Sequence, residues 1–237
     1  MESEIMIKYF VIGFPHTATT YCYKYILSKF KKLKGVFEPF NAEVVGWCKS
    51  FEKVHHYSEG EVEHHYNQLK PDLRKLIELN ATWFWDWVNN DKPTHPFLGL
   101  FWYQILEELH YSMDKYIVKD VCAWVYLKKI VPLFPSTRFI ILEKDRASVL
   151  RDFLSLYYRI DKAKHNPRWG LGLSLFYRKF HGVDKYPKPF NESVLARMFN
   201  DVYSKYLHLC NEIAHFWNVR IIAFEKRLED WMIERVI

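Results

Sequence analysis

Long apolar runs and a basic leader are both missing from this sequence of 237 residues. No stretch approaches the roughly 20 consecutive apolar residues that a membrane-spanning helix needs. The first ten residues, MESEIMIKYF, are acidic and then strand-like, whereas a secretory signal begins with a basic region and continues with an apolar one. These absences predict a soluble protein of the cytoplasm with no membrane partner.

Cysteine is scarce, and the spacings that bind metal ions are missing. The four cysteines are scattered and form no CxxC pair, so we expect free thiols in a reducing compartment. Two histidine pairs occur, at 55–56 and 64–65, but their spacing matches no zinc pattern and no cysteine accompanies them. The sequence therefore predicts no metal site.

Extreme charge is also absent. The formal net charge is +6, and the basic residues are spread along the chain apart from a cluster at 29–34. That cluster suits either a solvated helix end or a rim that attracts an anionic ligand. No module that reads nucleic acid is visible, so nucleic acid is not expected as a partner.

Linkers, repeats and low-complexity tracts are missing too, which indicates one domain over 1–237. Short apolar segments alternate with longer helical ones. The expected strands are 9–12, 35–39, 115–119, 137–142 and 219–224. The expected helices are 21–30, 69–79, 99–109, 122–134, 147–159 and 191–217. Strands separated by helices predict an α/β, three-layer fold with a central parallel β-sheet flanked by helices.

The most informative segment is the loop between the first strand and the first helix. The strand ends at Gly13, and the hydroxyl-rich turn PHTATT precedes the helix. A strand, a tight loop and a helix together aim backbone N–H groups and a helix N-terminus at an anion. The loop is not a nucleotide-kinase P-loop, because Ala18 and Thr19 stand where that motif has glycine and lysine.

The loop does resemble the phosphosulfate-binding loop of sulfotransferases, Gly-x-Pro-(Arg/Lys)-Ser-Gly-Thr-Thr. Three later segments resemble the same family in the same order, at 116–120, 134–142 and 220–228. The resemblance implies a P-loop NTPase-like sulfotransferase architecture, with helical insertions on the acceptor side at 41–113 and 160–190. It also implies metal-independent transfer of a sulfuryl group from 3′-phosphoadenosine 5′-phosphosulfate to a hydroxyl or amine.

By this resemblance, the 5′-phosphosulfate lies over the loop. The implied contacts are Pro15, His16, Thr17, Ala18, Thr19 and Thr20. His16 replaces the family's Arg or Lys, and a protonated imidazole poised near neutral pH could act on the sulfuryl group. The acceptor is left open as a small molecule, a carbohydrate or a protein, and a homodimer is possible.

The donor's 3′-phosphate is implied to lie at the end of the strand 137–142. In register, Lys144 replaces the family's Arg and Asp152 replaces its Ser. A lysine serves a phosphate as a point charge, but a carboxylate beside a phosphate repels it. Ser148 and Arg151 are close enough in sequence to compensate.

Two residues compete for the role of general base. Glu38 matches a Glu-Pro pair that follows the first helix in many carbohydrate and protein-tyrosine sulfotransferases. His95 is the alternative, because cytosolic sulfotransferases use a histidine from a later loop. We favour Glu38, and geometry must decide.

The altered positions leave two other functions open. A degenerate family member would bind a nucleotide or a partner without catalysis, which the substitutions at His16, Ala18 and Asp152 favour. A divergent small-molecule kinase is less favoured, because the lysine of the P-loop is missing.

Overall fold

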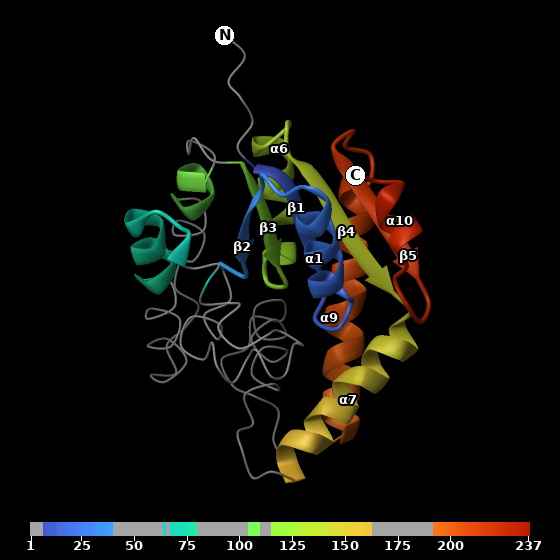
Figure 1. The fold of residues 1–237 in the computed structure, drawn as a ribbon. Coiled ribbons are helices and arrows are strands. Elements are labelled where there is room, and N and C mark those ends of the chain that lie inside the picture. Colours follow the sequence, from blue (N-terminus) through green and yellow to red (C-terminus); the bar gives the residue numbers. More distant parts are fainter. Residues whose placement is uncertain (1–6, 40–63, 65–66, 80–103, 110–114, 163–191) are drawn as a thin grey trace.

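The structure is a computed structural model that describes residues 7–39, 64, 67–79, 104–109, 115–162 and 192–237. At its centre lies a five-stranded parallel sheet in the order β2-β3-β1-β4-β5 (Figure 1). The strands are β1 (Ile7–Gly13), β2 (Lys34–Phe37), β3 (Tyr116–Asp120), β4 (Arg138–Lys144) and β5 (Val219–Phe224). The predicted α/β class with a central parallel sheet is confirmed. The ends of each predicted strand differ from those of an observed strand by at most two residues.

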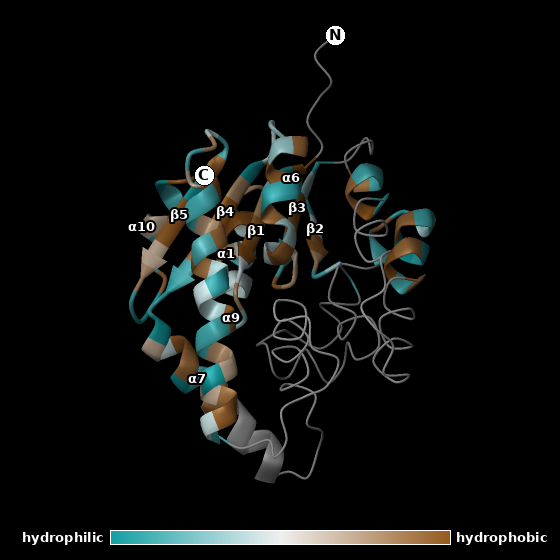
Figure 2. Ribbon diagram, turned by 180° about the vertical axis from the view of Figure 1, so that it is seen from behind, coloured by the Kyte–Doolittle hydropathy of each residue, from teal (hydrophilic) through white to brown (hydrophobic). Residues whose placement is uncertain are grey.

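Side chains alternate between two apolar layers, one on each face of the sheet. Along β1, Phe10 and Ile12 pack on the face covered by α9 (Glu192–Ile213), whereas Val11 packs on the face of α1 (Thr19–Lys29). The short helix α10 (Asp230–Glu234) joins α1 on that second face (Figure 1). Figure 2 shows the strands as mostly apolar. Strands that are buried on both faces must be apolar throughout, which is why their sequences do not alternate.

The helices differ from the prediction mainly at their ends. The segment predicted as one helix at 122–134 is divided into a 3₁₀ turn, η1 (Ala123–Tyr126), and α6 (Leu127–Leu133). The carboxylate of Asp120 accepts the backbone N–H groups of Cys122 and Ala123, at 2.6 Å and 2.8 Å. These bonds fix the entry into η1, because a side-chain acceptor satisfies N–H groups that no preceding turn can.

Two further helices confirm the predicted pattern with shifted bounds. The predicted helix 147–159 is α7 (Arg146–Lys162), and the predicted helix 191–217 is α9, which ends at Ile213. Shorter helices at 71–79 and 104–109 fall within predicted ones.

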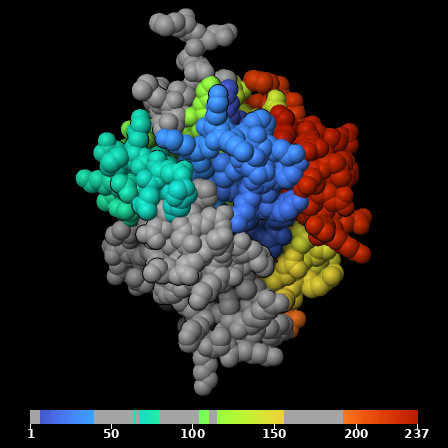
Figure 3. Space-filling view, viewed as in Figure 1, coloured from blue at the N-terminus to red at the C-terminus, as the bar shows by residue number. Residues whose placement is uncertain are grey.

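Within the described ranges, no helix is both long enough and apolar enough to cross a membrane. Figure 3 shows the α1 surface between those of 67–79 and the C-terminal segment.

Candidate functional site

The site lies at the carboxyl edge of the sheet, where the chain leaves its central strand. In the strand register, Ile12 is beside Asp120 of β3 and Gly13 is beside Leu142 of β4. The loop at 14–18 therefore has the end of β3 on one side and the end of β4 on the other. In parallel α/β sheets, ligands bind in the crevice outside the carboxyl ends of the strands.

Gly13 is required by the close approach of the loop to its own strand. A Cβ added there would lie 2.2 Å from Thr17 Oγ1 and 2.6 Å from Thr19 Cγ2. Thr17 closes the turn, because its N–H and its hydroxyl both donate to the carbonyl of Phe14, at 3.1 Å and 2.7 Å. The Thr17 side chain is fully buried, so its hydroxyl holds the loop.

The loop enters α1 through left-handed backbone conformations. His16 has a φ of 71° and Ala18 a φ of 58°. Ala18 is the N-cap residue of α1, and its methyl side chain makes no capping hydrogen bond. The first turn of a helix has backbone N–H groups without intrahelical acceptors, together with the positive end of the helix dipole. Thr19 and Thr20 are in this turn, where the sequence predicts an anion site, and the binding of an anion there stays a prediction.

Ala18→Gly is expected to stabilise the protein by about 1 kcal/mol, because glycine adopts a φ near 58° without the steric cost that alanine has. The free energy of unfolding from urea titration measures this gain. The matched control is Ala147→Gly in α7, where helical backbone makes glycine unfavourable by roughly 0.5–1 kcal/mol. Equal losses in both variants would contradict the strain at Ala18.

His16 is surrounded by groups from other elements, and its imidazole is neutral near pH 7. Its ring lies edge-on to Phe153 of α7, with centroids 5.9 Å apart. Burial lowers the pKa of His16 from 6.5 to about 4, while Asp152 opposes this shift and Lys144 adds to it. The expectation that His16 is poised to protonate near neutral pH is therefore wrong. A neutral imidazole still has one N–H that can donate.

Lys144 and Asp152, eight positions apart in the sequence, form an ion pair next to His16. The ammonium nitrogen of Lys144 lies 2.6 Å from a carboxylate oxygen of Asp152. The Lys144 side chain is 12% exposed and that of Asp152 is 46% exposed. The hydroxyl of Tyr203 in α9 donates to the Lys144 carbonyl. The structure thus brings together the loop and the segment predicted to hold a second phosphate.

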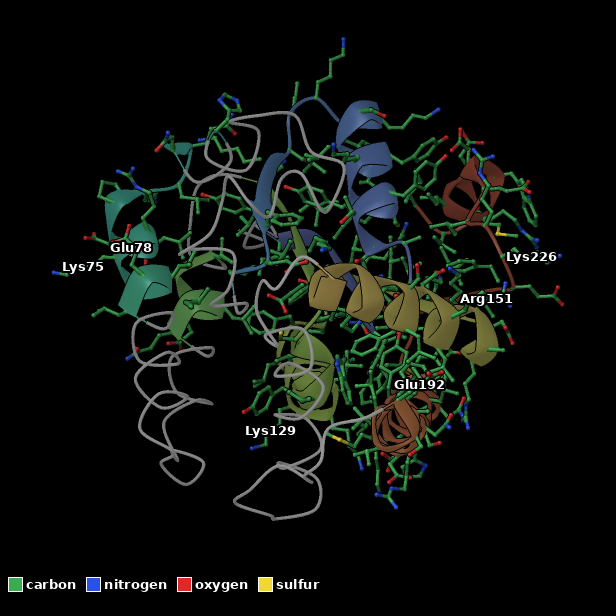
Figure 4. All side chains as sticks on the ribbon, turned by 90° about the horizontal axis from the view of Figure 1, so that it is seen from below. Lys75, Glu78, Lys129, Arg151, Glu192 and Lys226 are labelled. Atoms are coloured by element: carbon green, nitrogen blue, oxygen red, sulfur yellow. The ribbon has the colours of Figure 1, made fainter. Side chains whose placement is uncertain are left out.

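Ser148 and Arg151, the other two residues predicted for that phosphate, interact with Asp145. The backbone N–H of Ser148 donates to the Asp145 carboxylate at 2.9 Å. This bond, the Ser148 hydroxyl and the positive charge of Arg151 keep the pKa of Asp145 below its usual value. Asp145 therefore caps α7, and Arg151 is exposed on that helix (Figure 4).

On the other side of the loop, Glu38 and Lys119 form a fully buried ion pair. Both side chains are 1% exposed. The Lys119 ammonium also lies 4.4 Å from the ring centroid of Phe37. The Glu38 N–H donates to the Lys119 carbonyl at 2.6 Å, and Glu38 has a φ of 45°.

Lys119 was not among the predicted site residues. The signal for it was present, because Lys119 interrupts the apolar strand YIVKD, and lysine is almost never fully buried unless paired. His95, the alternative base, lies outside the described residues, so its role stays a prediction. Pro15 is half-buried within the loop.

No protein-family model matches this sequence, and no curated protein matches it. Among solved structures, the chain is similar to a shikimate kinase from Bacteroides thetaiotaomicron. The two chains share 11% identity over 98% of this chain and 94% of the kinase, with a TM-score of 0.38. A likeness at this level says nothing of activity, and the assignment of the fold rests on the sheet itself.

Proposed function

We propose that this protein is a sulfotransferase of the cytoplasm that uses 3′-phosphoadenosine 5′-phosphosulfate. The observation that carries the proposal is the N-terminus of α1, which follows the central strand through a left-handed turn and has an alanine, without a capping side chain of its own, at the N-cap position. The similarity of four sequence segments to sulfotransferases supports it. Two lysines, Lys119 and Lys144, flank the loop at the ends of the neighbouring strands. Positioned N–H groups and cations stabilise charge on a leaving phosphate without a metal ion.

In the proposed reaction, the bond between sulfur and the donor's phosphate oxygen breaks as a bond to the acceptor oxygen or nitrogen forms. The backbone N–H groups at Thr19 and Thr20 would hold the 5′-phosphate that leaves. The acceptor's proton goes to a general base, for which Glu38 and His95 remain the two candidates. Glu38 would have to exchange its contact with Lys119 for one with the acceptor. His16 would donate its neutral N–H to a sulfuryl oxygen.

A nucleotide-binding protein without catalysis is the second candidate. The observation in its favour is that Lys119 and Lys144 are each paired with a carboxylate, Glu38 and Asp152. A paired lysine gives less stabilisation to a phosphate than a free one. Transfer of sulfuryl from the donor to any acceptor would exclude this candidate.

Calorimetric titration with 3′-phosphoadenosine 5′-phosphate tests the nucleotide site. The double variant Thr19→Ala, Thr20→Ala should bind at least tenfold more weakly, about 1.4 kcal/mol, because two hydroxyls at the helix N-terminus are lost. Ser28→Ala is the matched control, since that hydroxyl lies near the opposite end of α1. Unchanged affinity in the folded double variant would contradict the assignment of the loop. Binding of ATP that depends on Mg²⁺ would instead indicate a kinase.

A further inference from the structure

The ion pair between Lys144 and Asp152 has a consequence for ligand selection at the proposed site. We propose that Asp152 is a built-in competitor of the nucleotide. Its carboxylate pairs with the ammonium of Lys144. A nucleotide whose second phosphate is to bind Lys144, beyond the phosphate held by the loop, must therefore displace this carboxylate. Asp152 thereby lowers affinity for such nucleotides selectively and determines specificity. The inference rests on the proposed function, because it assumes that a nucleotide binds at the loop.

The two partners are held in place to different degrees, which decides which of them moves. Lys144 ends β4, its side chain is 12% exposed, and its carbonyl accepts the hydroxyl of Tyr203. Asp152 is on α7 with 46% of its side chain exposed. A half-exposed carboxylate can turn into water at small desolvation cost, whereas a mostly buried ammonium cannot leave easily. Asp152 is therefore the partner that leaves.

The pair lies within reach of an anion on the loop. His16 is in the loop itself, and the charges of both Lys144 and Asp152 affect the pKa of its imidazole. Phe153, the neighbour of Asp152, packs against the His16 ring. An anion that extends from the loop toward α7 would meet Lys144 and Asp152 together.

Competition between two anions for one cation has a predictable outcome. A phosphate monoester carries between one and two negative charges, and it binds an ammonium more strongly than a carboxylate does. The phosphate can displace Asp152, but the free energy gained from its contact with Lys144 is offset in part by the loss of the contact between Lys144 and Asp152. An amide at position 152 keeps the shape and removes the charge, so the phosphate no longer has to compete.

The test compares two nucleotides that differ only in the second phosphate. Wild type, Asp152→Asn and Asp152→Ser are titrated with 3′-phosphoadenosine 5′-phosphate and with 5′-AMP at one ionic strength. Both variants should bind the first nucleotide at least tenfold more tightly than wild type and should bind 5′-AMP within twofold of wild type. In a Lys144→Met background, Asp152→Asn should change neither affinity.

A second ion pair supplies the control for net charge. Lys128 and Glu212 pair on α6 and α9, at 2.5 Å, so Glu212→Gln removes one carboxylate without touching the loop and should alter neither affinity. The proposal would be overturned if the Asp152 variants gained affinity equally for both nucleotides. It would also be overturned if they gained affinity for neither. If wild type binds both nucleotides and the Asp152 variants match it, the inference alone fails. If no protein binds either nucleotide, the proposed function fails with it.

Discussion

Lys119→Met is expected to destabilise the protein by about 3–5 kcal/mol, the largest effect that we expect from a single substitution. The variant would leave the carboxylate of Glu38 fully buried without its cation. Removing one partner of a buried ion pair costs this much because the remaining charge keeps its desolvation penalty and loses the attraction that offset it. The free energy of unfolding in guanidinium chloride measures the loss.

A second substitution separates the loss of charge pairing from the loss of packing. Lys119→Met with Glu38→Gln should recover at least half of the lost stability, since a neutral amide is far less costly to bury than a carboxylate. Lys128→Met is the control at an exposed ion pair, where the expected change is under about 1 kcal/mol. A change in stability for Lys119→Met as small as that for Lys128→Met would contradict the prediction. It would mean that water reaches the pair of Glu38 and Lys119.

Acid should destabilise the protein by about 3 kcal/mol between pH 6.5 and pH 4 through His16 alone. The folded state holds the pKa of His16 near 4, and the unfolded chain has the ordinary value of 6.5. The unfolded chain therefore binds more protons within this window, so stability is fully present above pH 6.5 and is lost as the pH falls toward 4. A difference of about 2.5 pKa units, at 1.36 kcal/mol each, gives this magnitude.

Unfolding in urea at several pH values, for wild type and for His16→Asn, measures this linkage. Asparagine suits the position because it tolerates a φ of 71° better than most residues. The wild type should lose about 3 kcal/mol more than the variant does over the window. His208→Asn is the control, because His208 is exposed on α9. Parallel pH profiles for wild type and His16→Asn would show that burial does not control the charge of His16.

The sequence alone determined the sheet and the position of the loop. Strands such as Tyr9–Ile12 and Phe139–Leu142 are short and wholly apolar, and longer amphipathic segments separate them. This pattern has few stable solutions besides a parallel sheet covered on both faces. Gly13 and the hydroxyl-rich turn after it predicted the tight loop, because few other residues permit such a close approach of backbone to side chains.

Only the tertiary structure decided the charges around the loop. Glu38 and Lys119 are 81 positions apart in the sequence, and the pairing of β2 with β3 makes them partners. Phe153 of α7 packs against the ring of His16, and burial lowers the pKa of His16, which makes a residue that would titrate near neutrality in water a neutral one. The physical reason is that the ionisation of a side chain depends on its burial and on the charges near it in space. Neighbours in the sequence fix neither of these.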